Sequence, residues 1–182
     1  MMDPLKFREL LRRIEWKNLA LLAVAVALLA AYFKLFIITA LIASVIAASL
    51  LVQKFQLRLF GFETVTFSTV IMGVAYGPVI GGIFGMAMVL VSLVISGYFG
   101  IYYLWIIPEY AVAAYLASQW YGGDILSVGL NITIILQVAN IVLTYFFDRY
   151  SFFQHIVYSA TNIVFNFAAF ALFGPVLVGI LK

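Results

Sequence analysis

The chain of 182 residues is 66% hydrophobic and only 9% charged, with a formal net charge of +3 at pH 7. A water-soluble surface needs more charge than this, whereas lipid can solvate the outside of a helical membrane protein. The apolar runs are long and unbroken, unlike the alternating strands of about ten residues in a membrane β-barrel. The composition therefore predicts an all-α protein, a polytopic transmembrane helical bundle.

The residue types in the chain limit the chemistry it can perform. There is no cysteine and one histidine, so we expect no disulfide, no structural zinc or iron–sulfur site and no cofactor. The spacings H-E-x-x-H, G-x-S-x-G and G-x-x-x-x-G-K are absent, so we expect no enzyme activity. The small net charge indicates no nucleic-acid partner. Any uptake would need energy from a partner or an ion gradient.

The first 17 residues form a distinct basic segment. They contain five cations and three anions, with leucine, isoleucine and aromatic residues at partly helical spacing. This pattern predicts a cytoplasmic lead-in helix on the lipid surface over residues 1–17, followed by a transmembrane domain over 18–182. A signal peptide would end in a small-residue cleavage site and a hydrophilic region, but here the apolar segments continue.

Two apolar runs follow, 18–33 and 35–52, divided only by Lys34. One continuous helix would be about 50 Å long, much more than the ~30 Å of a bilayer core. We therefore expect two short spans with a tight turn near Lys34. The first run also carries a small residue at every fourth position: Ala23, Ala27 and Ala31. Such a stripe packs closely against another helix, either of the same chain or of a partner subunit.

A stripe of glycines occupies the middle of the next apolar stretch, 64–96. The glycines recur at every fourth position and a proline interrupts them: Gly73, Gly77, Pro78, Gly81 and Gly85. Small residues at this spacing let a second helix approach closely. Proline removes a backbone donor, so Pro78 marks either a kink or the join between two spans. We expect this stripe to serve as a close-packed hinge.

The remaining sequence predicts three more spans, 104–121, 125–147 and 151–181, with a turn at 122–124. With 64–76 and 79–96 counted as separate spans, the total is seven, or six if the first run is not a separate span. With seven spans and a cytoplasmic N-terminus, eight cations lie inside and two outside, in agreement with the positive-inside rule. We therefore expect a multi-pass protein of the cell membrane whose N-terminus is cytoplasmic.

Polar side chains within the spans indicate where a ligand could bind, because such groups are costly in lipid. Glu109 is the only ionisable residue deep within a predicted helix, and it either contacts a ligand or ion in a cavity or is solvated at the interface. The spans 125–147 and 151–181 each carry four polar residues on one helix face. These faces either line a polar cavity or hydrogen-bond to each other. The candidate substrate contacts are Tyr76, Glu109, Gln137, Asn140, Asn162 and Asn166.

The run from Tyr76 to Gly85, Tyr-Gly-Pro-Val-Ile-Gly-Gly-Ile-Phe-Gly, resembles the substrate-binding S components of energy-coupling-factor vitamin transporters. The alanine stripe in the first apolar run is similar to one in that family. The resemblance implies a six-helix bundle with a vitamin-like ligand near the outer face, under the loop between the first two helices. It also implies that the stripe contacts a transmembrane coupling subunit, which is linked to two ATPases. The positive-inside count places the 53–63 loop in the cytoplasm, whereas the family would place it outside.

Three functions are compatible with these patterns. The first is a membrane-embedded substrate-binding subunit for uptake of a small, vitamin-like molecule, energised by partner subunits. The second is a non-transporting membrane scaffold, similar to the rod-shape-determining MreD proteins. The third is an autonomous ion-coupled carrier that uses Glu109.

Overall fold

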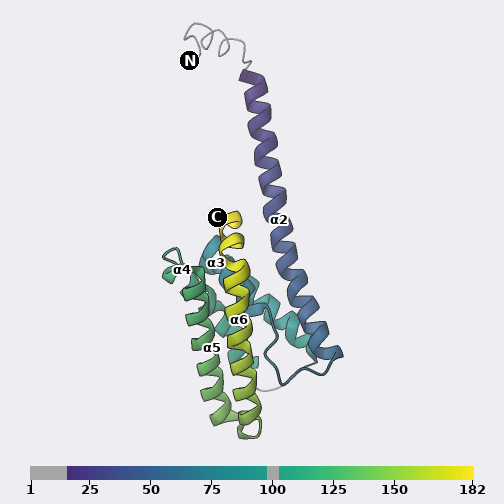
Figure 1. Cartoon of the computed structure of the whole chain (residues 1–182), viewed down its shortest axis with the longest axis vertical. Helices are drawn as coiled ribbons and strands as arrows, with labels where there is room; N and C mark the ends of the chain where they lie inside the picture. Colours follow the sequence, from purple (N-terminus) through teal and green to yellow (C-terminus); the bar gives the residue numbers. More distant parts are fainter. Residues whose placement is uncertain (1–15, 98–102) are drawn as a thin grey trace. The chain divides into compact units, whose positions relative to one another are not determined.

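The computed structural model describes residues 16–97 and 103–182, the first two of them by their backbone alone. This part of the chain contains helices and no β-strand, so the expected all-α class is confirmed (Figure 1). The elements, in chain order, are α2 (Trp16–Lys54), α3 (Val65–Ser96), α4 (Tyr103–Trp120), α5 (Ile125–Phe147), the 3₁₀ helix η1 (Arg149–Ser151) and α6 (Phe152–Leu181). The side chains of the predicted lead-in, 1–17, lie outside the described residues.

Four helices in the described ranges are long and apolar enough to cross a membrane: Asn18–Lys54, Val65–Ser96, Ile125–Phe147 and Arg149–Leu181. These helices suggest a multi-pass membrane protein, but the expected six or seven spans are not supported. Helix α4, which overlaps the predicted span 104–121, is not among the four. Its single acidic residue, Glu109, and its proline, Pro108, lower its apolar character.

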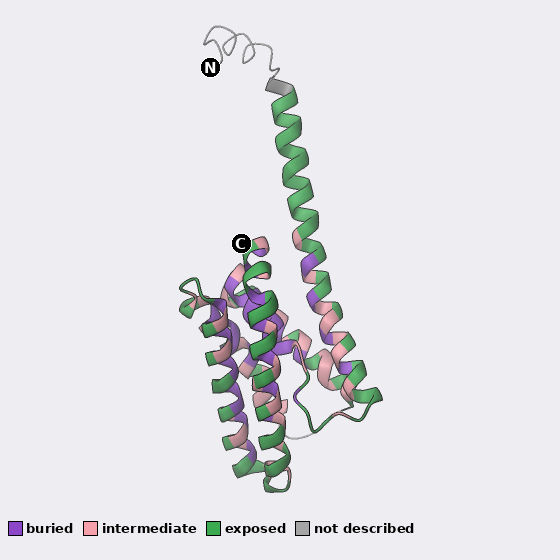
Figure 2. Cartoon of the chain, in the orientation of Figure 1, coloured by how far each residue is buried: buried purple, intermediate pink, exposed green. Residues whose placement is uncertain are grey.

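The expected turn near Lys34 is also wrong, because the two predicted spans 18–33 and 35–52 belong to one helix, α2. The run has no glycine or proline that would end a helix, and its many alanines and leucines favour continuation. The chain divides within this helix into two compact units, residues 1–38 and 39–182. In the first unit every side chain of 18–33 is exposed, including the three alanines of the stripe (Figure 2).

Helix α3 consists of two helices joined by a sharp reversal at Gly77. Gly77 has φ 84° and ψ 178°, a conformation that only glycine adopts without strain. In a straight helix the Cα atoms of Gly73 and Gly81 would lie about 12 Å apart. Instead, a Cβ atom placed on Gly81 would lie 2.6 Å from the Cα of Gly73. The two halves, 65–76 and 78–96, therefore fold back on each other.

Contacts further along the two halves follow from this reversal. A Cβ on Gly85 would lie 2.6 Å from Cγ2 of Thr69 in the other half, and Val65 and Val89 belong to one core cluster. Every residue from 65 to 74 is buried. The first half rises about 18 Å, less than the ~30 Å of a bilayer core. It is therefore an internal element that is enclosed by protein, and the glycine stripe is the surface on which the halves meet.

Glycine also sets the distance between neighbouring helices in the unit 39–182. A Cβ on Gly73 of α3 would lie 2.7 Å from the carbonyl oxygen of Ala114 on α4. A Cβ on Gly129 of α5 would lie 2.6 Å from the ring of Phe170 on α6. The unit therefore contains two closely packed pairs, α3 with α4 and α5 with α6, and the pairs contact each other through α3 with α6 and α4 with α5.

The variant Gly81→Ala should destabilise the protein, because its Cβ would overlap the backbone of Gly73. We expect the free energy of unfolding to fall by about 1–3 kcal/mol, measured by SDS titration in mixed micelles. Gly179→Ala is the matched control, since no atom lies within 4 Å of its Cβ position, and its stability should equal or slightly exceed that of the parent. Equal stability of the two variants would contradict the folded-back arrangement of α3.

Candidate functional site

The loop 55–64 between α2 and α3 is held against α6 at Gly61. The Gly61 N–H donates to Oγ1 of Thr161 (2.8 Å), and its carbonyl oxygen accepts from Nδ2 of Asn162 (3.0 Å). A Cβ on Gly61 would lie 2.6 Å from the carbonyl oxygen of Tyr158, so this approach requires glycine. The loop therefore touches α6 backbone to backbone at this point.

Glu63, at the end of the same loop, accepts hydrogen bonds from backbone N–H groups at the start of α3. Its carboxylate accepts hydrogen bonds from the backbone N–H of Val65 and of Thr66, the latter at 3.1 Å, and from Oγ1 of Thr66 at 2.7 Å. Nδ2 of Asn162 donates to the same carboxylate at 3.0 Å. A carboxylate in this position is favoured by the helix macrodipole. Donors within the protein therefore already compensate much of its negative charge.

Asn162 connects the loop to the polar faces of α5 and α6. Its Oδ1 accepts from Nε2 of Gln137 on α5 (2.9 Å) and from Nδ2 of Asn166 on α6 (3.1 Å). Oγ of Ser159 donates to Oε1 of Gln137 at 2.9 Å. The two predicted polar faces therefore meet and hydrogen-bond to each other here. Asn162 and Asn166 are fully buried in this network.

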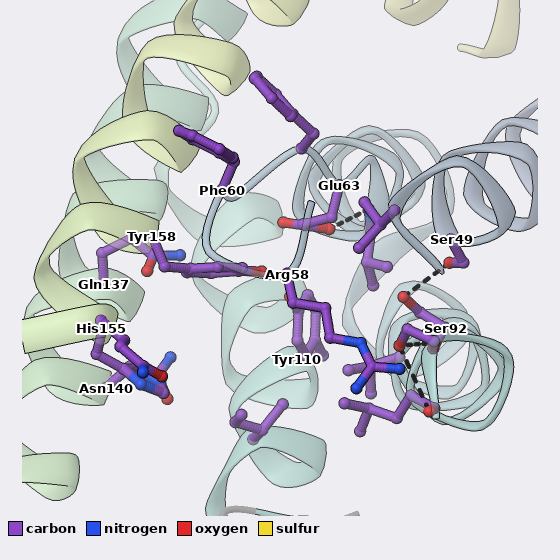
Figure 3. Close-up of a pocket in the computed structure, with 18 residues that line it drawn as sticks. Ser49, Arg58, Phe60, Glu63, Ser92, Tyr110, Gln137, Asn140, His155 and Tyr158 are labelled. Carbon is purple, nitrogen blue, oxygen red and sulfur yellow. Dashed lines mark hydrogen bonds between the residues drawn. The ribbon is translucent and has the colours of Figure 1, made fainter. Parts of the chain in front are cut away.

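A pocket of about 130 Å³ lies beneath the loop, lined by residues from the end of α2 and from α3 to α6 (Figure 3). One end carries the side chains of Gln137, Asn140 and His155, and the other carries Arg58 with Ser92 (Figure 3). Phe60 and Phe62 of the loop, with apolar residues of α3 and α4, form the walls. The polar lining residues are Ser49, Arg58, Glu63, Ser92, Ser96, Tyr110, Gln137, Asn140, Gln154, His155 and Tyr158. The pocket thus offers polar contacts inside an apolar bundle.

A second hydrogen-bonded cluster centres on Asn140, at the edge of the pocket. Its Oδ1 accepts from Nε1 of Trp105 (3.0 Å), and its Nδ2 donates to Oε2 of Glu109 (2.8 Å) and to the carbonyl oxygen of Leu136 (3.0 Å). The other carboxylate oxygen of Glu109 is buried and has no hydrogen-bond partner among the described residues. Glu109 is not a lining residue, so its link to the pocket runs through Asn140.

The predicted substrate contacts differ in whether they line the pocket. Gln137 and Asn140 line the pocket. Glu109 is hydrogen-bonded to Asn140 and Asn162 to Gln137, whereas Asn166 is hydrogen-bonded only to Asn162. Tyr76 adjoins the reversal at Gly77 and does not line the pocket. The role of these residues in binding stays a prediction.

Sequence reasoning missed the lining residues from the loop 55–64 and from the start of α6. Arg58 comes from the loop, and Tyr158 comes from α6. Signals for both were present in the sequence. Arg58 lies in the polar loop a few residues before Glu63, and Tyr158 precedes Asn162 by four positions, which places them on one helix face.

Comparison of the chain with protein-family models, with curated proteins and with solved structures finds no match. Within residues 16–97 and 103–182, no group of three or more histidine, aspartate or glutamate side chains is placed to hold a metal ion. The chemistry of the site therefore has to be inferred from the pocket itself.

The variant Asn162→Ala should destabilise the protein, because it removes the acceptor of the buried Gln137 amide and the donor to the Gly61 carbonyl oxygen and the Glu63 carboxylate. We expect a loss of about 1–3 kcal/mol in the free energy of unfolding, measured in mixed micelles. Asn131→Ala on the exposed face of α5 is the matched control and should lie within about 0.5 kcal/mol of the parent. An Asn162→Ala protein as stable as Asn131→Ala would show that the network does not hold the loop and helices together.

Proposed function

We propose that the protein is a membrane-embedded substrate-binding subunit that holds a small polar molecule in the pocket beneath the loop 55–64. In this proposal it serves uptake of that molecule at the cell membrane, energised by partner subunits. The single observation that carries the proposal is the pocket of about 130 Å³, which is lined by polar groups although the surrounding helices are apolar. Polar side chains are costly within an apolar bundle, so a cluster around a cavity favours a functional role over a purely structural one.

The hydrogen-bonding capacity of the pocket supports ligand binding. Gln137 uses one amide hydrogen on Asn162, and its Oε1 accepts from Ser159, which leaves one N–H and one lone pair for a ligand. Asn140 already uses both amide hydrogens, but its Oδ1 retains a lone pair beside the bond from Trp105. Their surrounding bonds hold these two side chains in fixed positions. A pre-organised polar end of this kind orients a small ligand at little entropic cost.

The position of the pocket also agrees with the resemblance to S components, which implies a ligand under the loop between the first two helices. In this chain the loop 55–64 joins α2 to α3 and supplies Arg58, Phe60 and Phe62 to the lining. A scaffold protein would need contact surfaces and would have no use for an internal polar pocket. The pocket is therefore the feature that favours the binding subunit over the scaffold.

The proposed partner subunits are supported by the first part of α2. Every side chain of 18–33 is exposed, and the stripe of Ala23, Ala27 and Ala31 lies within this range. Small residues at this spacing permit a close helix–helix contact in lipid. The chain also lacks a nucleotide-binding signature, so ATP-driven uptake would use the ATPase of a partner.

Ligand binding can be tested with the purified protein in detergent by isothermal titration against a panel of vitamins and nucleobases. We expect at least one micromolar ligand. Asn140→Ala should weaken its binding about tenfold or more, since it removes a positioned acceptor from the pocket. Asn131→Ala, on an exposed part of α5, should bind like the parent. Absence of any micromolar ligand, or binding that is indifferent to Asn140→Ala, would contradict the proposal.

Partner docking can be tested by co-purification from the native membrane. Ala27→Leu adds a bulky side chain to the middle of the alanine stripe and should reduce recovery of a coupling subunit and ATPases about tenfold or more. Val26→Leu, also exposed and next to it, is the control and should retain them. Recovery of morphogenetic or assembly proteins would favour the scaffold instead. Uptake into liposomes that contain this protein alone would favour the autonomous carrier.

A further inference from the structure

We infer that the ligand carries an anionic group, a carboxylate or phosphate, which binds at the end of the pocket formed by Arg58 and Ser92. This inference rests on the proposed function and names the chemical class of its substrate. It is carried by the charges that line the pocket and by the position of the guanidinium group.

The available charge in the pocket is positive. Among the lining residues, two carry a formal charge as lysine, arginine, aspartate or glutamate: Arg58 and Glu63. The Glu63 carboxylate accepts bonds from Val65, Thr66 and Asn162, so much of its acceptor capacity is used within the protein. Arg58 makes no hydrogen bond or ion pair with any residue in the described ranges, and its five N–H donors remain for a ligand. Arg58 can therefore bind an anion, whereas Glu63 has less acceptor capacity left for a cation.

The guanidinium group of Arg58 lies at one end of the pocket, beside the C-terminus of α3. Nη2 of Arg58 lies 3.5 Å from the Cβ position of Gly97, the C-cap of α3. The partial negative charge at a helix C-terminus favours an arginine here. Figure 3 shows the Arg58 side chain directed toward Ser92 and away from Glu63. The guanidinium group of this exposed side chain thus lies beside the helix end, with its hydrogens not used in bonds to the described residues.

Ser92 lies at the same end of the pocket, and its hydroxyl is already hydrogen-bonded. Its Oγ lies 2.9 Å from Oγ of Ser49, whose own hydroxyl hydrogen bonds to the carbonyl oxygen of Val45 at 2.8 Å. The hydroxyl of Ser96 instead donates to the backbone carbonyl oxygen of Ser92. Because a hydroxyl carries one hydrogen, Ser92 donates to Oγ of Ser49 when Ser49 donates to Val45, so recognition of the anion rests on Arg58. A guanidinium group forms charge-assisted hydrogen bonds to carboxylate or phosphate oxygens.

The size of the pocket limits the rest of the ligand. Its volume of about 130 Å³ is close to that of a cavity that holds one benzene ring, about 150 Å³. Phe60 and Phe62 offer apolar walls, and Gln137 and Asn140 offer uncharged polar contacts at the far end. The best match is a small ring-sized acid whose anionic group lies at Arg58.

The test uses full-length protein in nanodiscs of phosphatidylcholine and matched probes on one ring: benzoate, phenyl phosphate, benzamide and benzylamine. Titration calorimetry should show that an acidic probe binds at least about tenfold more tightly than the amide or the amine, as expected for a charge-assisted site. Arg58→Gln should abolish this preference. Lys54→Gln, in the last turn of α2 and outside the pocket lining, should retain it.

The outcomes separate this inference from the proposed function. If neither these probes nor the vitamin and nucleobase panel bind, both fail. If the amide or amine binds as tightly as the acids, or if a panel ligand binds and has no acidic group, the inference fails and the proposed function stands. An acid preference that survives in Arg58→Gln, or disappears equally in Lys54→Gln, also overturns it. Loss of acid binding at constant ionic strength when phosphatidylglycerol is added would assign the site to a lipid headgroup and overturn the soluble ligand.

Discussion

The reversal of α3 at Gly77 is the constraint on which the rest of the unit 39–182 depends. Because the two halves fold back on each other, the start of α3 at Val65 and a late turn at Val89 lie in one cluster. The pocket can therefore take Glu63 from before the helix and Ser92 from near its end. Without glycine in the contact between the halves, the backbones could not approach this closely. A local feature of four glycines thus decides where two distant parts of the sequence meet.

A second constraint is the need to satisfy polar groups where lipid offers no hydrogen bonds. Asn162 of α6 meets this need for two other elements at once, because it bonds to Gly61 and Glu63 of the loop and to Gln137 of α5. The glycine at 61 is required for the loop to reach it. Polar residues that resemble a binding site in the sequence can therefore act as the frame of that site instead. The residues that remain free to bind a ligand line the pocket beside this frame.

The helical class was predictable because long chargeless runs permit little else. The turn between α4 and α5 was predictable as well, since Gly123 has φ 110° and Asp124 caps α5 by accepting from the Leu126 N–H. The span count was not, because hydropathy cannot tell a continuous helix from two spans separated by one lysine. The loop contribution to the pocket was not predictable either. Arg58 and Gln137 are brought together by tertiary packing, which sequence spacing within one helix cannot reveal.

The attachment of the loop 55–64 has a consequence for the speed of ligand exchange. A molecule bound in the pocket would lie beneath this loop, which is hydrogen-bonded to Asn162 through Gly61 and Glu63. Asn162 also accepts a hydrogen bond from Gln137 of the pocket lining, so displacement of the loop from Asn162 would also release Gln137. In a binding subunit of the proposed kind, these shared hydrogen bonds of Asn162 would slow both the entry and the exit of the ligand. The residence time of the ligand could then be long even at moderate affinity, since both rates depend on one opening step.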